Sequence, residues 1–251
     1  MRDITRDAER LRALHVPREP LLLANVWDPP TACTAESAGL AAIATASAAL
    51  APANGYEDHG KLPAEVAFGA LARIAKAVSL PVTADLEDGY GLAAEELVER
   101  LLDAGACGLN LEDTDHGAHR LVDSEAQADR IAAIKAAGRA RGVDVVLNAR
   151  IDVLSHGHTI EEGLRRARRY LEAGADCTYP IFLADLPAIG DFAAIGPTNI
   201  LWRPGGPRLQ EIARAGAARI SVGPVFFRLA LKRLEAAMSA FRRLDDDAAC
   251  G

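Results

Sequence analysis

The feature that most constrains the fold of this chain is a repeated junction, in which Ala-Gly is followed by a short apolar segment. It occurs at residues 38–39, 104–105, 173–174 and 215–216. We interpret each junction as a helix end, because glycine adopts the left-handed conformation that terminates a helix, and the apolar segment after it as a buried strand. The spacing of the junctions is compatible with strand–helix units of roughly 30 to 40 residues.

Eight candidate strands are separated by amphipathic helical segments. The strands are predicted over residues 21–25, 41–45, 81–85, 108–112, 145–149, 177–181, 199–202 and 219–222, and the clearest helices over 93–104, 125–141 and 160–173. Regular alternation indicates a parallel sheet, and eight repeats indicate closure into an α/β fold, a single (β/α)8 TIM-type barrel. The alternative is an open doubly wound sheet, but no GxGxxG motif follows the first strand.

A single barrel domain is predicted over residues 1–244, since a chain of 251 residues suits one barrel and no linker divides it, and residues 245–251 are predicted to be a frayed tail. The net charge of −7 comes without a cluster of Lys and Arg, which argues against nucleic acid and membranes as partners. Scattered cysteines, and the lack of a signal-peptide pattern or a long apolar run, indicate a cytoplasmic protein that acts on a small molecule.

Polar residues follow nearly every predicted strand, which places them together at one end of a barrel. Asp85 and Glu87 lie two residues apart and share a face, and Glu112 ends the next predicted strand. Carboxylates gathered in a partly buried cavity repel one another unless a cation offsets their charge. Oxygen ligands without accompanying Cys or His favour Mg²⁺ or Mn²⁺ over Zn²⁺. The alternative is that these acids are helix caps and salt-bridged surface groups.

Two arginines are candidates for binding the acid groups of a substrate. Arg150 ends the fifth predicted strand, and its planar guanidinium suits a carboxylate, although pairing with one of the acids is the alternative. Arg203 follows the seventh predicted strand, where it would hold a second carboxylate and favour a dicarboxylic acid as substrate.

These residues belong to a set of motifs through which the chain resembles the isocitrate lyase/phosphoenolpyruvate mutase superfamily over almost its whole length. The matching motifs are NVWDP at 25–29, TASAA at 45–49, GYED at 55–58, PVTADLEDGYG at 81–91, GLNLED at 108–113, NARID at 148–152 and RISVGP at 219–224. Each motif is weak by itself, but the set is highly specific in this order and spacing.

The resemblance implies a barrel whose last helix is exchanged between subunits, giving a homo-oligomer built as a dimer of helix-swapped dimers. It implies that Asp85 binds Mg²⁺ directly, and that Asp58, Glu87 and Glu112 hold the ion through water. The implied substrate-binding residues are Trp27, Ser47, Ala48, Asp85, Arg150 and Arg203, and the implied catalytic residues are Asp58 and Arg150. The broad apolar surface of residues 225–241 suits a helix that packs on a second subunit.

The function that this resemblance implies is that of a Mg²⁺-dependent lyase or decarboxylase. It would cleave a C–C bond in a small 2-oxo or 2-hydroxy dicarboxylic acid through an enolpyruvate-type intermediate. The chain departs from isocitrate and methylisocitrate lyases after the fourth strand, where those enzymes carry Lys-Lys-Cys-Gly-His and residues 114–121 here read TDHGAHRL. We therefore do not expect isocitrate lyase itself.

The same segment supplies two candidates for the catalytic proton donor, His116 and His119, because imidazole titrates near neutral pH. The alternative is that both are exposed loop histidines. Two other functions stay open: a P–C bond mutase or hydrolase that acts on a phosphonopyruvate, and a non-catalytic homologue that binds a ligand at a retained metal site.

Overall fold

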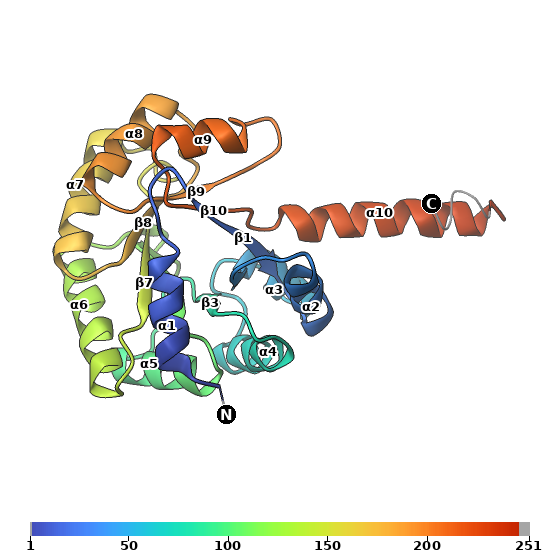
Figure 1. Ribbon diagram of the computed structural model, residues 1–251, viewed down its shortest axis with the longest axis horizontal. Coiled ribbons are helices and arrows are strands. Elements are labelled where there is room, and N and C mark those ends of the chain that lie inside the picture. The colour runs from blue at the N-terminus through green and yellow to red at the C-terminus, as the bar shows by residue number, and fades with distance from the viewer. Residues whose placement is uncertain (1, 246–251) are drawn as a thin grey trace.

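The structure is a computed structural model that describes residues 2–245, and its main feature is a nearly closed barrel of eight parallel strands (Figure 1). The strands are β1 (Leu21–Val26), β2 (Ile43–Thr45), β3 (Val82–Asp85), β4 (Gly108–Glu112), β7 (Val146–Ile151), β8 (Cys177–Pro180), β9 (Asn199–Leu201) and β10 (Arg219–Ser221). They lie in the order β8-β7-β4-β3-β2-β1-β10-β9, and a parallel bridge between Thr178 and Thr198 joins the two ends. This arrangement confirms the TIM-type barrel and excludes the open doubly wound sheet.

Helices connect successive strands and cover the outside of the barrel, and one further helix, α10, follows the last strand. They are α2 (Pro29–Ser37), α3 (Ser47–Ala53), α4 (Ala64–Ala77), α5 (Ala94–Asp103), α6 (Ser124–Ala140), α7 (Ile160–Glu172), α8 (Leu186–Ile195), α9 (Leu209–Ala215) and α10 (Val225–Arg242). The glycines of all four repeated junctions have positive φ angles, between 79° and 114°. Each of them follows a helix, so the interpretation of the junctions is confirmed.

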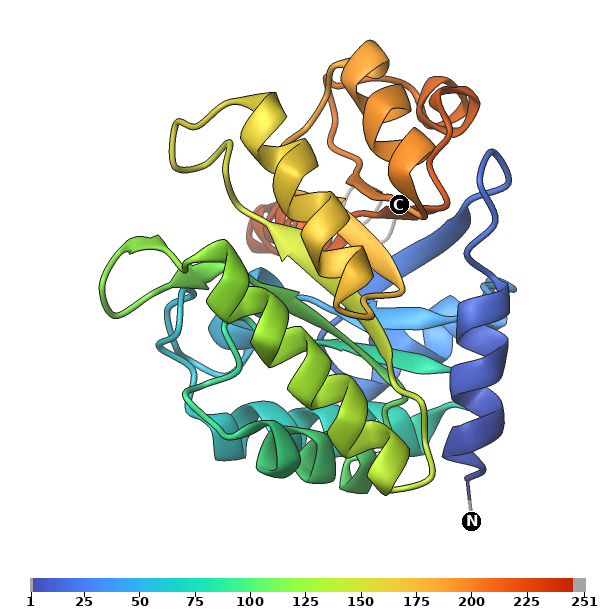
Figure 2. The same ribbon diagram turned by 90° about the vertical axis from the view of Figure 1, so that its left-hand side faces the viewer.

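Helix α1 (Ile4–Ala13) covers the amino-terminal end of the barrel, opposite the loops that follow β4 and β7 (Figure 2). The Arg12 guanidinium pairs with Asp176, just before β8, at 2.7 Å. Buried Lys135, from α6, contacts the same Asp176 at 2.8 Å and donates to the carbonyl of Val145, just before β7. These ion pairs therefore hold α1 and α6 against this end of the barrel.

Two features lie outside the regular alternation. A short hairpin of β5 (Thr114–Asp115) and β6 (Arg120–Leu121) follows β4, where the sequence predicted only a loop. Helix α10 points away from the barrel (Figure 1). Its apolar side chains are accordingly exposed, for example Leu234 at 50% and Phe241 at 76%.

Most of the tail predicted over 245–251 lies outside the described residues, since only Asp245 belongs to them. Its fraying, and the assignment of 1–244 to one domain, stay predictions. Within residues 2–245, no helix combines the length and apolar character needed to span a membrane.

Candidate active site

A cavity of about 270 Å³ opens at the carboxyl ends of the strands. The predicted site residues that line it are Ser47, Ala48, Asp58, Asp85, Glu87, Glu112, Arg150 and Arg203. They come from the ends of five different strands or from the segments after them, because parallel strands of a barrel all end at the same face. The cavity is smaller than a drug-sized pocket, so it suits a small ligand.

Asp85 and Glu87 are each fixed by a backbone N–H group of a neighbouring loop. Ser47 donates its backbone N–H to Asp85 Oδ2 at 2.9 Å, and Gly60 donates to Glu87 Oε2. Each hydrogen bond uses one carboxylate oxygen. Glu87 Oε1 and Asp58 Oδ1 are buried without a hydrogen-bond partner among the described residues. Buried oxygens left in this state are unfavourable unless something outside the chain binds them.

The negative charges of the carboxylates around the cavity are only partly offset by positive groups nearby. Burial raises the pKa of Glu87 to about 8, and the neighbouring carboxylates Asp85, Asp58 and Glu112 add to that rise. Burial also raises the pKa of Glu112, against the opposing effect of Arg150 and His116. Both shifts mean that the ionised carboxylates lack sufficient positive charge around them, which is the electrostatic condition for a cation site.

Glu87 also carries backbone strain. Its φ angle is +50°, in the left-handed region that residues other than glycine rarely adopt. The conformation is held in place by the backbone N–H of Glu112, which donates to the Glu87 carbonyl at 3.0 Å. Strain of this kind persists where the surrounding structure imposes it, most often at functional sites.

His116 is the predicted proton donor that reaches the carboxylates. From the turn of the hairpin, its Nε2 contacts Glu112 Oε1 and lies 3.8 Å from Glu87 Oε2. The hydrogen bond to Glu112 raises the pKa of His116 to about 9. Ligand atoms of Glu87, Glu112 and His116 lie within 4.8 Å of one another, so the three side chains could hold a metal ion. His119 lies on the exposed side of the same turn.

Arg150 lines the cavity but is already paired. Its Nη1 lies 2.5 Å from Glu112 Oε2, and its Nε lies 2.7 Å from Asp152 Oδ1. The alternative weighed from the sequence, that Arg150 pairs with one of the acids, is thus the geometry observed. The pairing orients the guanidinium at the cavity wall while neutralising most of its charge.

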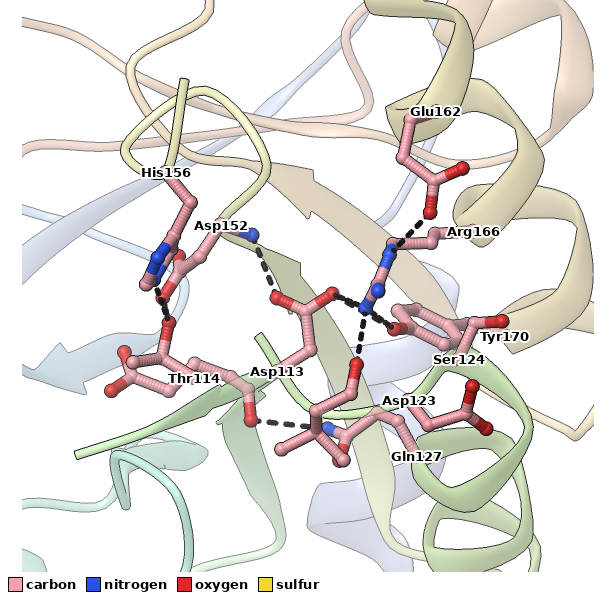
Figure 3. A network of polar contacts seen from close by, with 12 residues as sticks. Asp113, Thr114, Asp123, Ser124, Gln127, Asp152, His156, Glu162, Arg166 and Tyr170 are labelled. Atoms are coloured by element: carbon pink, nitrogen blue, oxygen red, sulfur yellow. Dashed lines mark hydrogen bonds and ion pairs between the residues drawn. The ribbon is translucent and has the colours of Figure 1, made fainter. Parts of the chain in front are cut away.

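A buried polar network lies behind this wall (Figure 3). The Asp113 carboxylate, which has no exposed surface, accepts from Arg166 and from the hydroxyl of Tyr170, both at 2.8 Å, and from the backbone N–H of Asp152. Gln127 donates to the Glu112 carbonyl. The network therefore joins the ends of β4 and β7, which carry Glu112 and Arg150, to helices α6 and α7.

Several residues that the structure brings to the site were not predicted from the sequence. Asn110, Tyr179, Phe182 and Arg228 line the cavity. Asn110 had a signal, as a polar residue inside an apolar strand, whereas Arg228 lies in the otherwise apolar segment 225–231 and had none. Predicted Trp27 is not among the lining residues, and its ring packs edge-on against Phe227 at 5.1 Å.

The donor set fits Mg²⁺ or Mn²⁺ as the sequence suggests. Carboxylate side chains line the cavity, and Glu87 Oε1 and Asp58 Oδ1 are buried without hydrogen-bond partners among the described residues. The imidazole of His116 lies close enough to Glu87 and Glu112 to share a metal ion with them. Hard divalent cations prefer such oxygen ligands, whereas Zn²⁺ sites are built mainly from Cys and His.

Comparisons with known proteins cover nearly the whole barrel. Residues 11–242 match the family described as phosphoenolpyruvate phosphomutase. The chain is 30% identical over 193 residues to 2-methylisocitrate lyase of Escherichia coli K12, covering 72% of this chain and 64% of that enzyme.

Two solved structures share the fold. The crystal structure of a candidate phosphonomutase from Burkholderia cenocepacia J2315 superposes with a TM-score of 0.88 and 37% identity, covering 94% of this chain and 98% of that one. A phosphonopyruvate hydrolase in complex with oxalate and Mg²⁺ superposes with a TM-score of 0.84 and 25% identity, covering 94% and 87% of the two chains.

Proposed function

The chain belongs to the phosphoenolpyruvate phosphomutase family, and from this premise we propose that it is a Mg²⁺-dependent lyase or decarboxylase. Its substrate in this proposal is a small 2-oxo or 2-hydroxy dicarboxylic acid, in which it cleaves a C–C bond. The observation that carries the proposal is the group of under-compensated carboxylates that lines one small cavity, with Arg150 beside Glu112 in the same lining. The similarity to 2-methylisocitrate lyase supports a lyase, and the Mg²⁺ in the related hydrolase supports the metal.

The proposed roles follow from the contacts of each side chain. Asp58, Asp85, Glu87 and Glu112 would hold the metal ion. When bound, that ion acts as a Lewis acid and stabilises the negative charge that develops on a substrate oxygen as the bond breaks. Ser47 and Ala48 form the wall beside Asp85, and Arg150, held by Asp152, orients an acid group of the substrate.

His116 is the proposed proton donor. Its raised pKa keeps Nε2 protonated at neutral pH, and the hairpin places that nitrogen beside Glu112, which lines the cavity. The Asp113 network supports the same geometry from behind, because it fixes the strand ends from which Glu112 and Arg150 project.

The alternative is a mutase or hydrolase that breaks the P–C bond of a phosphonopyruvate. The 37% identity to the candidate phosphonomutase favours it, as does the hairpin sequence TDHGAHRL, which lacks the Cys of the isocitrate lyase loop. A homologue that binds ligand without turnover is the third outcome, and the hairpin sequence motivates it as well.

One assay separates the three. Purified protein with Mg²⁺ is offered oxaloacetate, substituted malates and phosphonopyruvate, while pyruvate release is followed by a coupled assay and inorganic phosphate is measured in parallel. We expect pyruvate from a dicarboxylic acid, with activity lost in EDTA and restored by Mg²⁺. Phosphate release, or conversion of phosphonopyruvate to phosphoenolpyruvate, would establish P–C chemistry instead. Metal binding without turnover of any substrate would leave the binding homologue.

We also propose that α10 packs against a second copy of the chain. The final helix of a (β/α)8 barrel normally covers its first and last strands, but α10 projects from the barrel, and Leu22 on the outside of β1 is 46% exposed. The exposed apolar face of α10 fits that vacant position on another copy, and reciprocal exchange would cover both helices. A monomer by analytical ultracentrifugation at micromolar concentration would contradict this proposal.

A further inference from the structure

Three polar side chains from different strands meet inside the barrel, behind the lining of the cavity. Asn110, from β4, accepts at Oδ1 from Nδ2 of Asn148 on β7 at 2.8 Å and from Nη2 of Arg219 on β10 at 3.1 Å. Strands β4 and β10 are not neighbours in the sheet, so the second contact crosses the barrel interior. Asn148 and Arg219 have no exposed surface. Branched apolar side chains normally fill such an interior, so this polar group departs from the usual barrel core.

The two donors fix which end of the Asn110 amide is left for the cavity. A guanidinium has N–H groups but no acceptor, so the carbonyl oxygen of the amide must face Arg219. Within residues 2–245, Asn110 Nδ2 forms no hydrogen bond, and it is not among the polar atoms that are both buried and unpartnered. Because Asn110 lines the cavity, these N–H groups are open to a ligand there.

A second asparagine of the cavity lining has no such free donor. Asn25 Nδ2 donates to the carbonyl of Thr45 at 2.7 Å, and Asn25 Oδ1 accepts from the backbone N–H groups of Val222 and Gly223. Both ends of that amide therefore bind the main chain. Of the two amide side chains that line the cavity, Asn110 is the one that can donate to a ligand.

The position of Arg219 is unfavourable for stability. Its Nε and Nη1 atoms are buried without a hydrogen-bond partner in the described part of the chain. Burial lowers the pKa of Arg219, because a guanidinium removed from water without a carboxylate beside it is poorly compensated. Within residues 2–245, the only hydrogen bond of this side chain is the one to Asn110. Residues that lower stability in this way are expected at functional sites.

We propose that Asn110 donates a hydrogen bond from Nδ2 to an oxygen of the bound substrate, and that Arg219 is the positioning residue that holds the amide in this orientation. The inference rests on the proposed function, in which the oxo-acid end of the substrate binds beside the metal. Asn110 pairs in register with Asp85, the proposed metal ligand, and both side chains line the cavity. The group that accepts the hydrogen bond is a carboxylate or carbonyl oxygen of a 2-oxo acid.

The test removes the donor in two ways and measures binding by calorimetry, for Mg²⁺ alone and for pyruvate in the presence of Mg²⁺. Asn110→Asp keeps an oxygen for Arg219 but has no N–H, and Asn110→Leu has no N–H and adds no charge. We expect both variants to bind Mg²⁺ and to lose about tenfold in affinity for pyruvate, which corresponds to one hydrogen bond to an anion. Asn110→Ser replaces the leucine variant if that variant does not fold.

The two variants separate the missing donor from the added charge. If affinity for pyruvate falls only in Asn110→Asp, repulsion between anions explains the loss and the proposal is overturned. Asn199→Asp is the matched control, because Asn199 is buried in register with Arg219 but does not line the cavity. This control places the same charge inside the barrel, and its affinity for pyruvate should stay within about twofold of the wild type.

A third substitution tests the positioning role of Arg219. Replacing a poorly paired buried charge by an apolar side chain of similar size is often neutral or stabilising, so Arg219→Met should keep or raise the thermal unfolding midpoint. Its affinity for pyruvate should nevertheless fall by about threefold or more, because the amide loses a donor that orients it. Arg219→Lys, which can donate to the same oxygen, should recover part of that loss. A destabilised Arg219→Met with unchanged affinity would show a purely structural role.

The inference and the proposed function fail in different ways. If the wild-type protein binds pyruvate with Mg²⁺ and the Asn110 variants bind it equally well, the role of Asn110 is wrong while the proposed function stands. If the wild-type protein binds Mg²⁺ but not pyruvate, the proposed function is wrong, and the role of Asn110 that rests on it is wrong as well.

Discussion

At the amino-terminal end of the barrel, buried Lys135 lies between Asp144 and Asp176, at 2.8 Å from each. At the carboxyl end, Asp85, Glu87 and Glu112 lie around one cavity, and burial raises the pKa of two of them. Both ends contain buried charge, but Lys135 has carboxylate partners from within the chain, whereas Glu87 Oε1 and Asp58 Oδ1 have no hydrogen-bond partner among the described residues. The difference indicates that the paired charges around Lys135 stabilise the fold, whereas the unpartnered carboxylates are the ones that we propose bind a ligand.

The largest effect that this comparison predicts is on activity. Asp85→Asn keeps an oxygen that can accept the Ser47 N–H but removes the charge of the proposed metal ligand. We expect kcat/KM to fall by at least about 10,000-fold, or about 5 kcal/mol of transition-state stabilisation, with the thermal unfolding midpoint retained. Asp129→Asn, at an exposed position on α6, is the control. Activity within tenfold of the wild type would show that Asp85 does not bind the metal.

At the opposite end, loss of a charge should affect stability instead. Lys135→Met removes the cation shared by Asp144 and Asp176 and leaves Asp176 partly buried with fewer partners. We expect the free energy of unfolding, measured in urea, to fall by about 4 kcal/mol, while activity per folded molecule is unchanged. Loss of activity with unchanged stability would contradict the division between the two ends.

The pH dependence of stability tests the environment of His15, a buried residue just after α1. Burial, assisted by Arg219, lowers the pKa of His15 to about 4, while Asp176 opposes that shift. The folded state thus keeps His15 neutral below the ordinary pKa of 6.5, whereas the unfolded chain takes up a proton there. Stability should fall by up to about 3 kcal/mol as the pH drops from about 6.5 to about 4. In His15→Gln this decrease should be smaller by that amount; identical slopes for both proteins would refute the assignment.

The smallest effect is expected where an ion pair is exposed. Arg139 lies 3.9 Å from Asp144, and its side chain is 58% exposed. Arg139→Met should lower the free energy of unfolding in urea by less than about 1 kcal/mol, because solvent screens the pair. A loss as large as that of Lys135→Met would mean that burial does not decide which pairs stabilise this end.

The sequence predicted the barrel and the carboxylates of the cavity because both depend on local patterns. Short apolar strands followed by polar residues place Asp85, Glu87 and Glu112 at one face once the strands are parallel. The position of His116 was harder to predict. It depends on a hairpin with two residues in each strand, and the hydrophobic periodicity of the sequence does not reveal such a short hairpin. Its contact with Glu112, four residues earlier, arises from the turn of that hairpin.

The network around Asp113 could not be predicted from the sequence, for a different reason. Arg166 is one of four arginines in the segment RRARR of α7, and nothing local distinguishes the one that turns inward to Asp113, 53 residues away. Trp27 illustrates the reverse case. Its motif implied contact with substrate, but the described structure places the ring against Phe227 of α10, so that role stays a prediction.

The position of α1 has a consequence for how the chain assembles. Its Arg12 pairs with Asp176, 164 residues later, and donates to the carbonyl of Asp144. During synthesis, the first helix therefore emerges long before the strands that it covers, and must wait for about two thirds of the polypeptide to follow. Contacts of such long range slow the search for the native state, so the end of the barrel that is best fastened should also be among the last to close.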